Sequence, residues 1–153
     1  MLAATITLTS FTTDRLSDTF RPAEITARGL VAALRQSSET KFVALFPTLS
    51  DFLRQMDANQ AFYGSNLEAA KAEFTETYVD ELLPAVRRAY ATLLAEAEKR
   101  GINWTDVNIQ SVQILKSGFT MSLEQGDKKF DILVEKALMI DGRSKVSQHV
   151  TLR

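Results

Sequence analysis

Acid–base chemistry has very few candidate residues in this chain. The 153 residues include a single His, His149, and no Cys. A neutral imidazole can act as a general base near neutral pH, whereas the lack of Cys excludes a disulfide framework, a thiolate nucleophile and a Cys/His zinc site. Val150 and Leu152 share one face of the last predicted strand, and alternation puts His149 on the other face. We therefore expect His149 to be an exposed strand residue.

A carboxylate inside an apolar cavity is the next candidate, because desolvation raises its pKa toward neutral pH and lets it accept a proton. Asp131 is flanked by two strand hydrophobes, Phe130 and Ile132. Alternation places its side chain opposite theirs, on the face expected to be solvated. Asp131 is therefore kept only as an alternative catalytic residue, and the leading prediction contains no catalytic residue.

Four aromatic residues are candidates for ligand binding: Tyr63, Tyr78, Tyr90 and Trp104. Each combines a large apolar body, which can stack on a ligand, with a polar tip that can orient it by one hydrogen bond. Aromatic residues at helical spacing also form ordinary protein cores, so both interpretations stay open. The sequence has no Gly-rich phosphate loop, no metal-ligand motif and no Ser-His-Asp signature. It predicts neither a metal site nor a cofactor.

Composition and charge narrow the classes of partner. Eighteen Lys and Arg residues against nineteen Asp and Glu residues give a net charge of −1, so nucleic acid is not an expected partner. The pairs Arg87-Arg88 and Lys128-Lys129 are too short to form a nucleic-acid track. The apolar stretches are far shorter than the roughly 20 residues needed to cross a bilayer, so no membrane span is expected. Apolar residues make up 45% of the chain, which suits one domain with its own core.

The elements that position these residues begin with three helices. Apolar spacing predicts a helix over residues 21–36 and a short helix over residues 39–46. Thr48 and Asp51, three positions apart, have the form of a capping pair and predict the start of a third helix. Residues 59–65 are expected to form a loop.

A long helix is predicted next. From Asn66 onward apolar residues recur every three or four positions until Gly101, which follows Lys99 and Arg100 and is a typical helix stop. Pro84 lies inside this run, where it removes one backbone donor and crowds the carbonyl four residues earlier. The sequence therefore predicts one long helix that is bent between Asp80 and Pro84.

After Trp104 the apolar period changes to two, which predicts antiparallel strands. A change of phase predicts a bulge near Gln110-Ser111, and Asp141-Gly142 predicts a tight hairpin before a last strand that contains Val146 and Leu152. Helices followed by strands favour an α+β fold, with the helices packed on a C-terminal four-stranded antiparallel sheet. Residues 21–153 are expected to form this single domain.

Residues 1–20 have three open interpretations. Thr5 and Thr7 alternate with Ile6 and Leu8, which is compatible with a short strand. The segment can also be a loosely attached tail, or the remnant of an export signal. No basic residue precedes Arg15, so no secretory signal is recognisable as written.

Three stretches carry a resemblance to known proteins: LFPT at residues 45–48, LLAEAEKRGINW at 93–104 and EKALMIDGRSKV at 135–146. They resemble small bacterial proteins, often exported, that are similar to the cystatin-like, nuclear transport factor two-like superfamily. The likeness covers about residues 21–153. It implies a cone of curved sheet and helices that can enclose an apolar pocket, and homodimers formed through the sheet. Some members are isomerases, cyclases or dehydratases. The resemblance therefore indicates the fold but does not identify one activity.

Two functions are compatible with these observations. The favoured one is a non-catalytic binding or interaction module that takes an unknown small apolar ligand or a protein partner in a pocket between helices and sheet. The alternative is an isomerase-like or cyclase-like enzyme that uses Asp131 or a tyrosine in that pocket. A space filled by side chains would exclude the enzyme; the residues expected to fill it are Phe74, Tyr78, Val86, Phe130 and Ile132. The resemblance suggests export to the periplasm, and a cytoplasmic location is the alternative.

Overall fold

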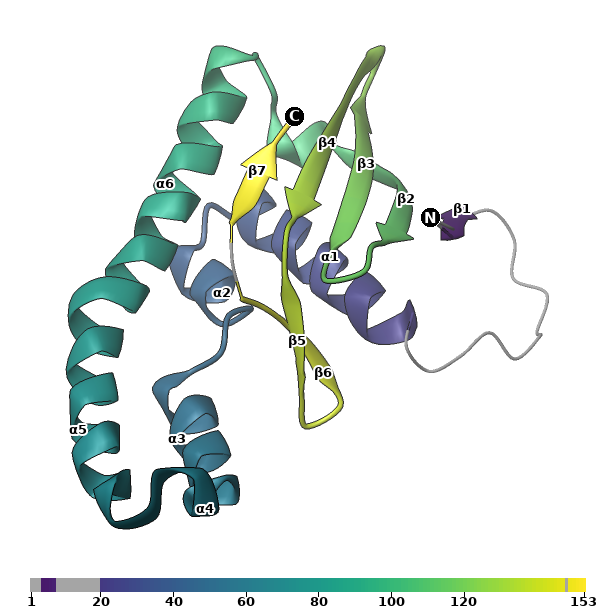
Figure 1. The fold of residues 1–153 in the computed structure, drawn as a ribbon. Coiled ribbons are helices and arrows are strands. Elements are labelled where there is room, and N and C mark those ends of the chain that lie inside the picture. Colours follow the sequence, from purple (N-terminus) through teal and green to yellow (C-terminus); the bar gives the residue numbers. More distant parts are fainter. Residues whose placement is uncertain (1–3, 8–19, 148) are drawn as a thin grey trace.

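The computed structural model describes residues 4–7, 20–147 and 149–153, and it has the predicted α+β architecture (Figure 1). The helices are α1 (Phe20–Arg35), α2 (Glu39–Val43), α3 (Leu49–Ala58), α4 (Gln60–Tyr63), α5 (Leu67–Thr77) and α6 (Leu83–Lys99). The strands are β1 (Ala4–Thr7), β2 (Asn108–Ile114), β3 (Phe119–Gln125), β4 (Lys128–Val134), β5 (Ala137–Ile140), β6 (Arg143–Val146) and β7 (Val150–Leu152). The predicted tail beyond Thr7, with Leu8, lies outside the described residues, as does Gln148.

The C-terminal strands β2, β3, β4 and β7 form the predicted four-stranded antiparallel sheet. Strand β1 pairs with β2, which extends the order to β1-β2-β3-β4-β7. The register of β2 against β3 shifts between Ile109 and Ser111, so the predicted bulge is confirmed. Because of this bulge, Ile109 before it and Val112 after it both face the core.

The Asp141-Gly142 hairpin is confirmed, but it does not belong to the sheet. Asp141 and Gly142 have φ angles of 50° and 71°, as a tight turn of this kind requires, and they join β5 to β6 in a separate two-stranded ribbon. The prediction of one last strand containing both Val146 and Leu152 was therefore wrong. The amide of Val146 donates to the carbonyl of Leu45 at 2.8 Å, so β6 ends against the corner after α2, and pairing with β4 begins again only at Val150.

The core lies between one face of the sheet and helices α1, α2 and α6. Its largest fully buried side chains come from all of these elements and include Leu30, Leu34, Phe42, Leu93, Phe119, Met121, Leu123, Ile132 and Val134. Strands β3 and β4 alternate as predicted, with Met121 paired to Ile132 on the buried face. Gly118, just before β3, lies close against the end of β4, because a Cβ on Gly118 would lie 1.9 Å from the carbonyl oxygen of Val134.

The long helix is continuous but irregular where Pro84 predicted a disturbance. Helices α5 and α6 are joined by a π-helical turn over Tyr78–Leu82, and Pro84 lies in the first turn of α6. A wider turn accommodates the missing backbone donor of the proline. The stop at Gly101 is confirmed, because Gly101 has a φ of 64° and the amide of Ile102 donates to the carbonyl of Ala97 at 2.8 Å.

Two helix boundaries differ from the predictions. The short helix predicted over residues 39–46 ends at Val43, because the next amides make tighter turn bonds, such as Phe46 N–H to the carbonyl of Val43 at 3.0 Å. Residues 59–65, predicted as a loop, contain helix α4 and the start of a 3₁₀ turn at Gly64–Asn66. A single helical turn has too few residues to show a period in the sequence.

Residues 49–82, which comprise α3, α4, α5 and the π-helical turn, are called the arm below. The rest of the described chain is called the body. In Figure 1 the arm extends beyond the end of the sheet, and α5 packs against α3 and α4 rather than on strands.

Candidate functional site

Fully buried side chains occupy the core between helices and sheet, and the two hollows described below, among the residues that the structure describes, lie at its margin and in the arm. The side chains expected to fill the core do so only in part. Ile132 is fully buried, and Val86 and Phe130 pack against the core from its margin. Phe74 and Tyr78 lie instead in the arm, where they are half-buried. Hollows that could accept a ligand lie at the margin of the core.

The groove that best fits an apolar ligand lies where the arm meets the body, and we call it the body groove. It has a volume of about 450 Å³. It is lined by Val43, Phe46, Pro47, Phe52, Tyr78, Leu82, Leu83, Ala85, Val86, Ala89, Glu135, Ser147 and His149. Most of these residues are apolar, and the few polar ones are typical of groups that orient a ligand in such a site.

Three parts of the chain form the walls of the body groove. The long helix supplies Tyr78, Leu82 and Val86, which recur every four residues across the π-helical turn. The corner between α2 and α3 supplies Phe46 and Pro47, both buried. The third wall is the edge of the sheet.

That third wall is held by a backbone bond that continues the ladder of β4 and β7. The amide of Glu135 donates to the carbonyl of His149 at 3.1 Å. This bond places Glu135 directly beside His149 at the rim of the body groove, where both residues are exposed. The sequence showed the exposure of His149 but gave no sign that it lines a groove.

Tyr78 is the predicted ligand-binding residue that lies in the body groove. Its hydroxyl donates to the carbonyl oxygen of Pro47 at 3.3 Å, and its ring lies edge-on to Phe52 with 6.2 Å between ring centroids. Burial raises the pKa of Tyr78 above the ordinary tyrosine value. Tyr78 is therefore protonated at neutral pH and serves as a hydrogen-bond donor, not as a base.

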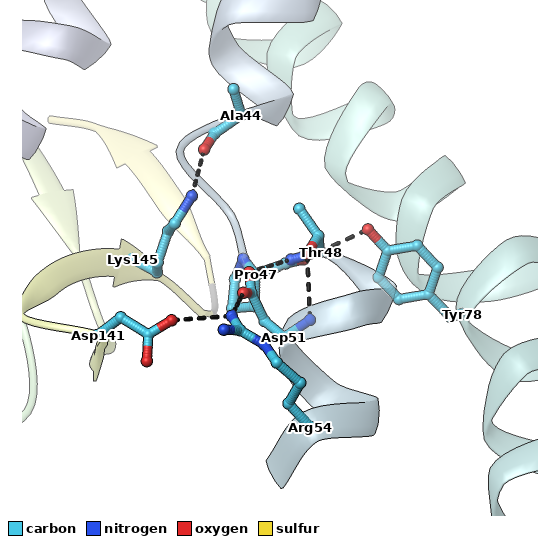
Figure 2. A network of polar contacts seen from close by, with 8 residues as sticks. All are labelled: Ala44, Pro47, Thr48, Asp51, Arg54, Tyr78, Asp141 and Lys145. Carbon is cyan, nitrogen blue, oxygen red and sulfur yellow. Dashed lines mark hydrogen bonds and ion pairs between the residues drawn. The ribbon is translucent and has the colours of Figure 1, made fainter.

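A polar network fixes the corner that carries Pro47 (Figure 2). The amide of Thr48 donates to the Asp51 carboxylate at 2.9 Å, and the amide of Asp51 donates to the Thr48 hydroxyl at 3.1 Å, so the predicted capping pair is confirmed. Arg54 reaches Asp51 at 2.6 Å and Asp141 of the ribbon at 2.8 Å. Lys145 of β6 donates to the carbonyl of Ala44 at 2.7 Å. The network thus joins the arm, the corner and the ribbon.

Asp51 is the charged centre of this network, with only 9% of its surface exposed. The bond from the Thr48 amide lowers the pKa of Asp51 below its ordinary value, against the opposing effect of burial, and the Thr48 hydroxyl, Arg54 and Lys145 add to the lowering. Asp51 is therefore ionised at neutral pH and acts as a helix cap.

The other three aromatic candidates do not lie in the body groove. Tyr90 and Trp104 are core residues with 6% and 7% exposure, and Tyr90 packs on Phe42 with 5.2 Å between ring centroids. Neither the Tyr90 hydroxyl nor the Trp104 indole N–H has a hydrogen-bond partner among the described residues. Burial, followed by the charge of Glu39, raises the pKa of Tyr90. Tyr63 lies in the arm, beside a different hollow.

Asp131 does not line the body groove. It is half-buried in β4, opposite Ser122 of β3, and lines a shallow hollow with Lys129 and Arg153. Its pairing with Ser122 puts it on the sheet face that alternates with the core face of Met121 and Ile132. An acid in this position lacks the apolar enclosure that the enzyme hypothesis requires.

A second hollow, the arm groove, has a volume of about 580 Å³. It lies among α3, α4 and α5 and is lined by Phe52, Gln55, Met56, Asn59, Phe62, Tyr63, Ala70, Glu73, Phe74 and Thr77. Phe62 is 86% exposed and meets Tyr63 edge-on at 5.2 Å. The two grooves adjoin at Phe52, which lines both.

Within residues 4–7, 20–147 and 149–153, no cluster of three acidic or His side chains is arranged to hold a metal ion. The helices in the same part of the chain include none that is both long and apolar enough to cross a membrane.

Comparisons of this chain with models of protein families, with curated proteins and with solved structures found no match. The resemblance to the nuclear transport factor two-like superfamily therefore stays a prediction.

Proposed function

We propose that this protein is a non-catalytic binding module whose body groove takes a small apolar ligand with a polar end. The lining of the groove supports this proposal: two walls are almost entirely apolar, and the third carries Glu135, Ser147 and His149. An apolar chain would lie against Leu82, Val86 and Phe46, where contact removes apolar surface from water. A hydroxyl at its other end would reach the polar rim.

The volume of the groove supports a ligand of modest size. About 450 Å³ lies within the range of roughly 300–1,000 Å³ that is typical of small-molecule sites. The polar network around Asp51 fixes Pro47 on one wall, and the bond between Glu135 and His149 fixes another. Walls that are already in place reduce the ordering cost of binding.

A titration with dodecanol tests this proposal. Ala85 lines the body groove and is exposed, so Ala85→Trp fills the groove without removing a core contact, whereas Ala91→Trp adds the same ring to an exposed site of α6 outside the groove. We expect Ala85→Trp to weaken dodecanol binding by about tenfold or more, a loss of about 1.4 kcal/mol, and Ala91→Trp to bind like the native chain. Equal binding by all three proteins would contradict the proposal, and so would the lack of any rise in melting temperature with dodecanol.

Catalysis in the same groove is the second candidate, because Tyr78, Glu135 and His149 all line it. A desolvated acid or base is what proton transfer would require, but Glu135 and His149 are exposed and the raised pKa of Tyr78 keeps it protonated. This supports binding over turnover. Proton NMR of a lipid-like aldehyde, dodecanal, incubated with the protein in D₂O is the test. We expect no deuterium uptake at the carbon next to the carbonyl beyond that in buffer alone, and uptake that is lost in Tyr78→Phe would favour the enzyme.

Self-association through the sheet, implied by the resemblance, is proposed separately. Thr120, Ser122 and Asp131 alternate with the core residues of β3 and β4, so they lie on the sheet face away from the core. That face is available for a second copy. Light scattering on the full chain measures the mass directly, and a monomer at all concentrations would contradict a sheet-mediated dimer.

A further inference from the structure

We infer that the arm groove is a docking site for a basic amphipathic helix of a protein partner. This site is distinct from the small-ligand site in the body groove. Three observations carry the inference: an apolar floor with an exposed aromatic residue, an excess of negative charge around it, and a length suited to a helix.

The floor of the arm groove is apolar and incompletely covered. Phe52 and Phe74 pack with 4.9 Å between ring centroids, and Met56 lies beside them. Phe62 also lines the groove, and 86% of its surface is exposed. A large aromatic side chain beside a hollow is typical of the anchors that carry most of the energy of a protein interface.

The arm has a strong net negative charge, which basic residues elsewhere in the chain offset. Residues 49–82 contain seven acidic and two basic residues, a net charge of −5, whereas the whole chain has a net charge of −1. Both basic residues already pair with acids: Arg54 with Asp51 and Asp141, and Lys71 with Asp57 and Glu68.

Four further acids of the arm have no ion-pair partner among the described residues. Glu73, Glu76, Asp80 and Glu81 are exposed, and no basic side chain in the described part of the chain lies within ion-pair distance of them. Glu73 lines the arm groove itself, and Glu76 lies on the next turn of the same helix. Lysines and arginines of a partner would compensate these charges, speed its association and fix its register.

The negative charge of the arm disfavours a second copy of this chain or an anionic membrane as the occupant of the arm groove. Two copies of this chain that met arm to arm would bring together two surfaces of net charge −5, and an anionic membrane would repel such a surface. Helix α5 has 11 residues and therefore a length of about 16 Å, or three turns. A groove of this length between helices suits a partner helix whose apolar residues recur every three or four positions.

The test uses the full chain and two synthetic peptides of about 18 residues, or five helical turns. One peptide has Leu every three or four positions and Lys elsewhere, and the other has Glu in place of Lys. We expect the Lys peptide to bind and its helical circular dichroism signal to increase on binding. Its affinity should fall as the NaCl concentration is raised, and the Glu peptide should not bind. Equal binding of both peptides would overturn the inference, as would a failure of the Lys peptide to bind.

Matched variants locate the site. Phe62→Ser removes the exposed anchor, and Val79→Ser changes an exposed apolar residue of the arm outside the groove. Glu73→Lys reverses a charge in the groove, and Glu98→Lys makes the same change on an exposed site of α6. We expect Phe62→Ser and Glu73→Lys each to lower the affinity for the Lys peptide by about tenfold or more. The two control variants should bind the Lys peptide with the affinity of the native chain. Native-like binding by Phe62→Ser and Glu73→Lys would overturn the proposed location.

The proposals for the two grooves can be tested independently. Phe62→Ser should still bind dodecanol, and Ala85→Trp should still bind the Lys peptide, because neither residue lines the other groove. Binding of the chain to anionic vesicles, or formation of a dimer, that is lost in Phe62→Ser would assign the arm groove to a different occupant and overturn the inference.

Discussion

Helix α1 of the body buries Ala27, Leu30 and Ala33 completely, whereas in residues 49–82, all of which the structure describes, Asp51 and Met56 are the only buried residues. The body is therefore built as a core between two layers. The helices of the arm pack mainly on one another and meet the body at the corner that carries Pro47 and at the ribbon. The arm lacks a second layer to cover its apolar side chains (Figure 1).

The comparison indicates that the body supplies most of the stability and that the arm supplies exposed surface for binding. Buried apolar area supplies most of the stability of a domain, so we expect most of the free energy of unfolding to come from the body. The arm depends on a capping box, on ion pairs that are largely exposed, and on the half-buried contact of Phe52 with Phe74. A region with few buried contacts opens at lower cost, and it leaves surface free for binding.

The largest effect is expected in the core of the body. Phe42 is fully buried and packs on Phe46 and Tyr90, with ring centroids 5.3 Å and 5.2 Å away. Phe42→Ala should lower the free energy of unfolding by about 3–5 kcal/mol, because it removes apolar contacts and leaves a cavity. Urea unfolding measures this loss. A loss no greater than that of an exposed arm residue would contradict the assignment of stability to the body.

The next effect is expected where arm and body join. Asp51→Asn removes the charge that the Thr48 amide binds, and it should lower the free energy of unfolding by about 1–2 kcal/mol. Asp80→Asn changes an exposed acid of the arm that has no ion-pair partner among the described residues, and it serves as the control, with a loss within about 0.5 kcal/mol. If the two variants lose the same amount, the network around Asp51 does not hold the joint.

The contribution of Asp51 should depend on pH. Its pKa is lower in the folded chain than in the unfolded chain, chiefly because of the Thr48 amide bond. The stabilisation is therefore complete above the ordinary pKa of an aspartate and is lost as the pH falls through the folded value. Melting temperatures of the native chain and Asp51→Asn should converge over that acidic window. A difference that stays constant throughout it would show that the charge of Asp51 contributes nothing.

A smaller effect is expected at the bend between arm and body. Pro84 lies in the first turn of α6, after the π-helical turn, where its missing N–H is tolerated. Pro84→Ala should fold and change the free energy of unfolding by less than about 1 kcal/mol, with a shift in helix geometry that NMR chemical shifts of Tyr78–Leu82 would report. A variant that fails to fold would show that the proline sets the structure of this segment.

The smallest effect is expected at the tip of the arm. Phe62 is almost fully exposed, so Phe62→Ala should change the free energy of unfolding by no more than about 0.5 kcal/mol. Urea unfolding beside Phe42→Ala makes the comparison direct, since the two variants remove the same atoms. A loss close to that of Phe42→Ala would mean that the arm has a core of its own.

Local features of the fold were predictable because each depends on a few neighbouring residues. The Thr48–Asp51 box, the stop at Gly101, the bulge after Ile109 and the Asp141-Gly142 turn are all present in the structure. Each follows from backbone bonds and φ angles within a short segment. The change of apolar period from 3.6 to 2 likewise separated helices from strands.

The candidate sites were less predictable, because residues remote in the chain form them. Of the four aromatic candidates, Tyr78 lines the body groove and Tyr63 the arm groove, while Tyr90 and Trp104 are core residues. All four have the same apolar body and polar tip, so the sequence could not separate them.

The sequence by itself determined the α+β class, the irregularity of the long helix before Pro84 and the lack of any thiol. The tertiary structure decided that β5 and β6 leave the sheet, that Tyr90 and Trp104 belong to the core, and that Pro47, Val86 and His149 meet around one groove. The physical reason is the range of the interactions. Hydrogen bonds of turns and caps act within a few residues, whereas a groove exists only where apolar surfaces from distant segments pack without filling the space between them.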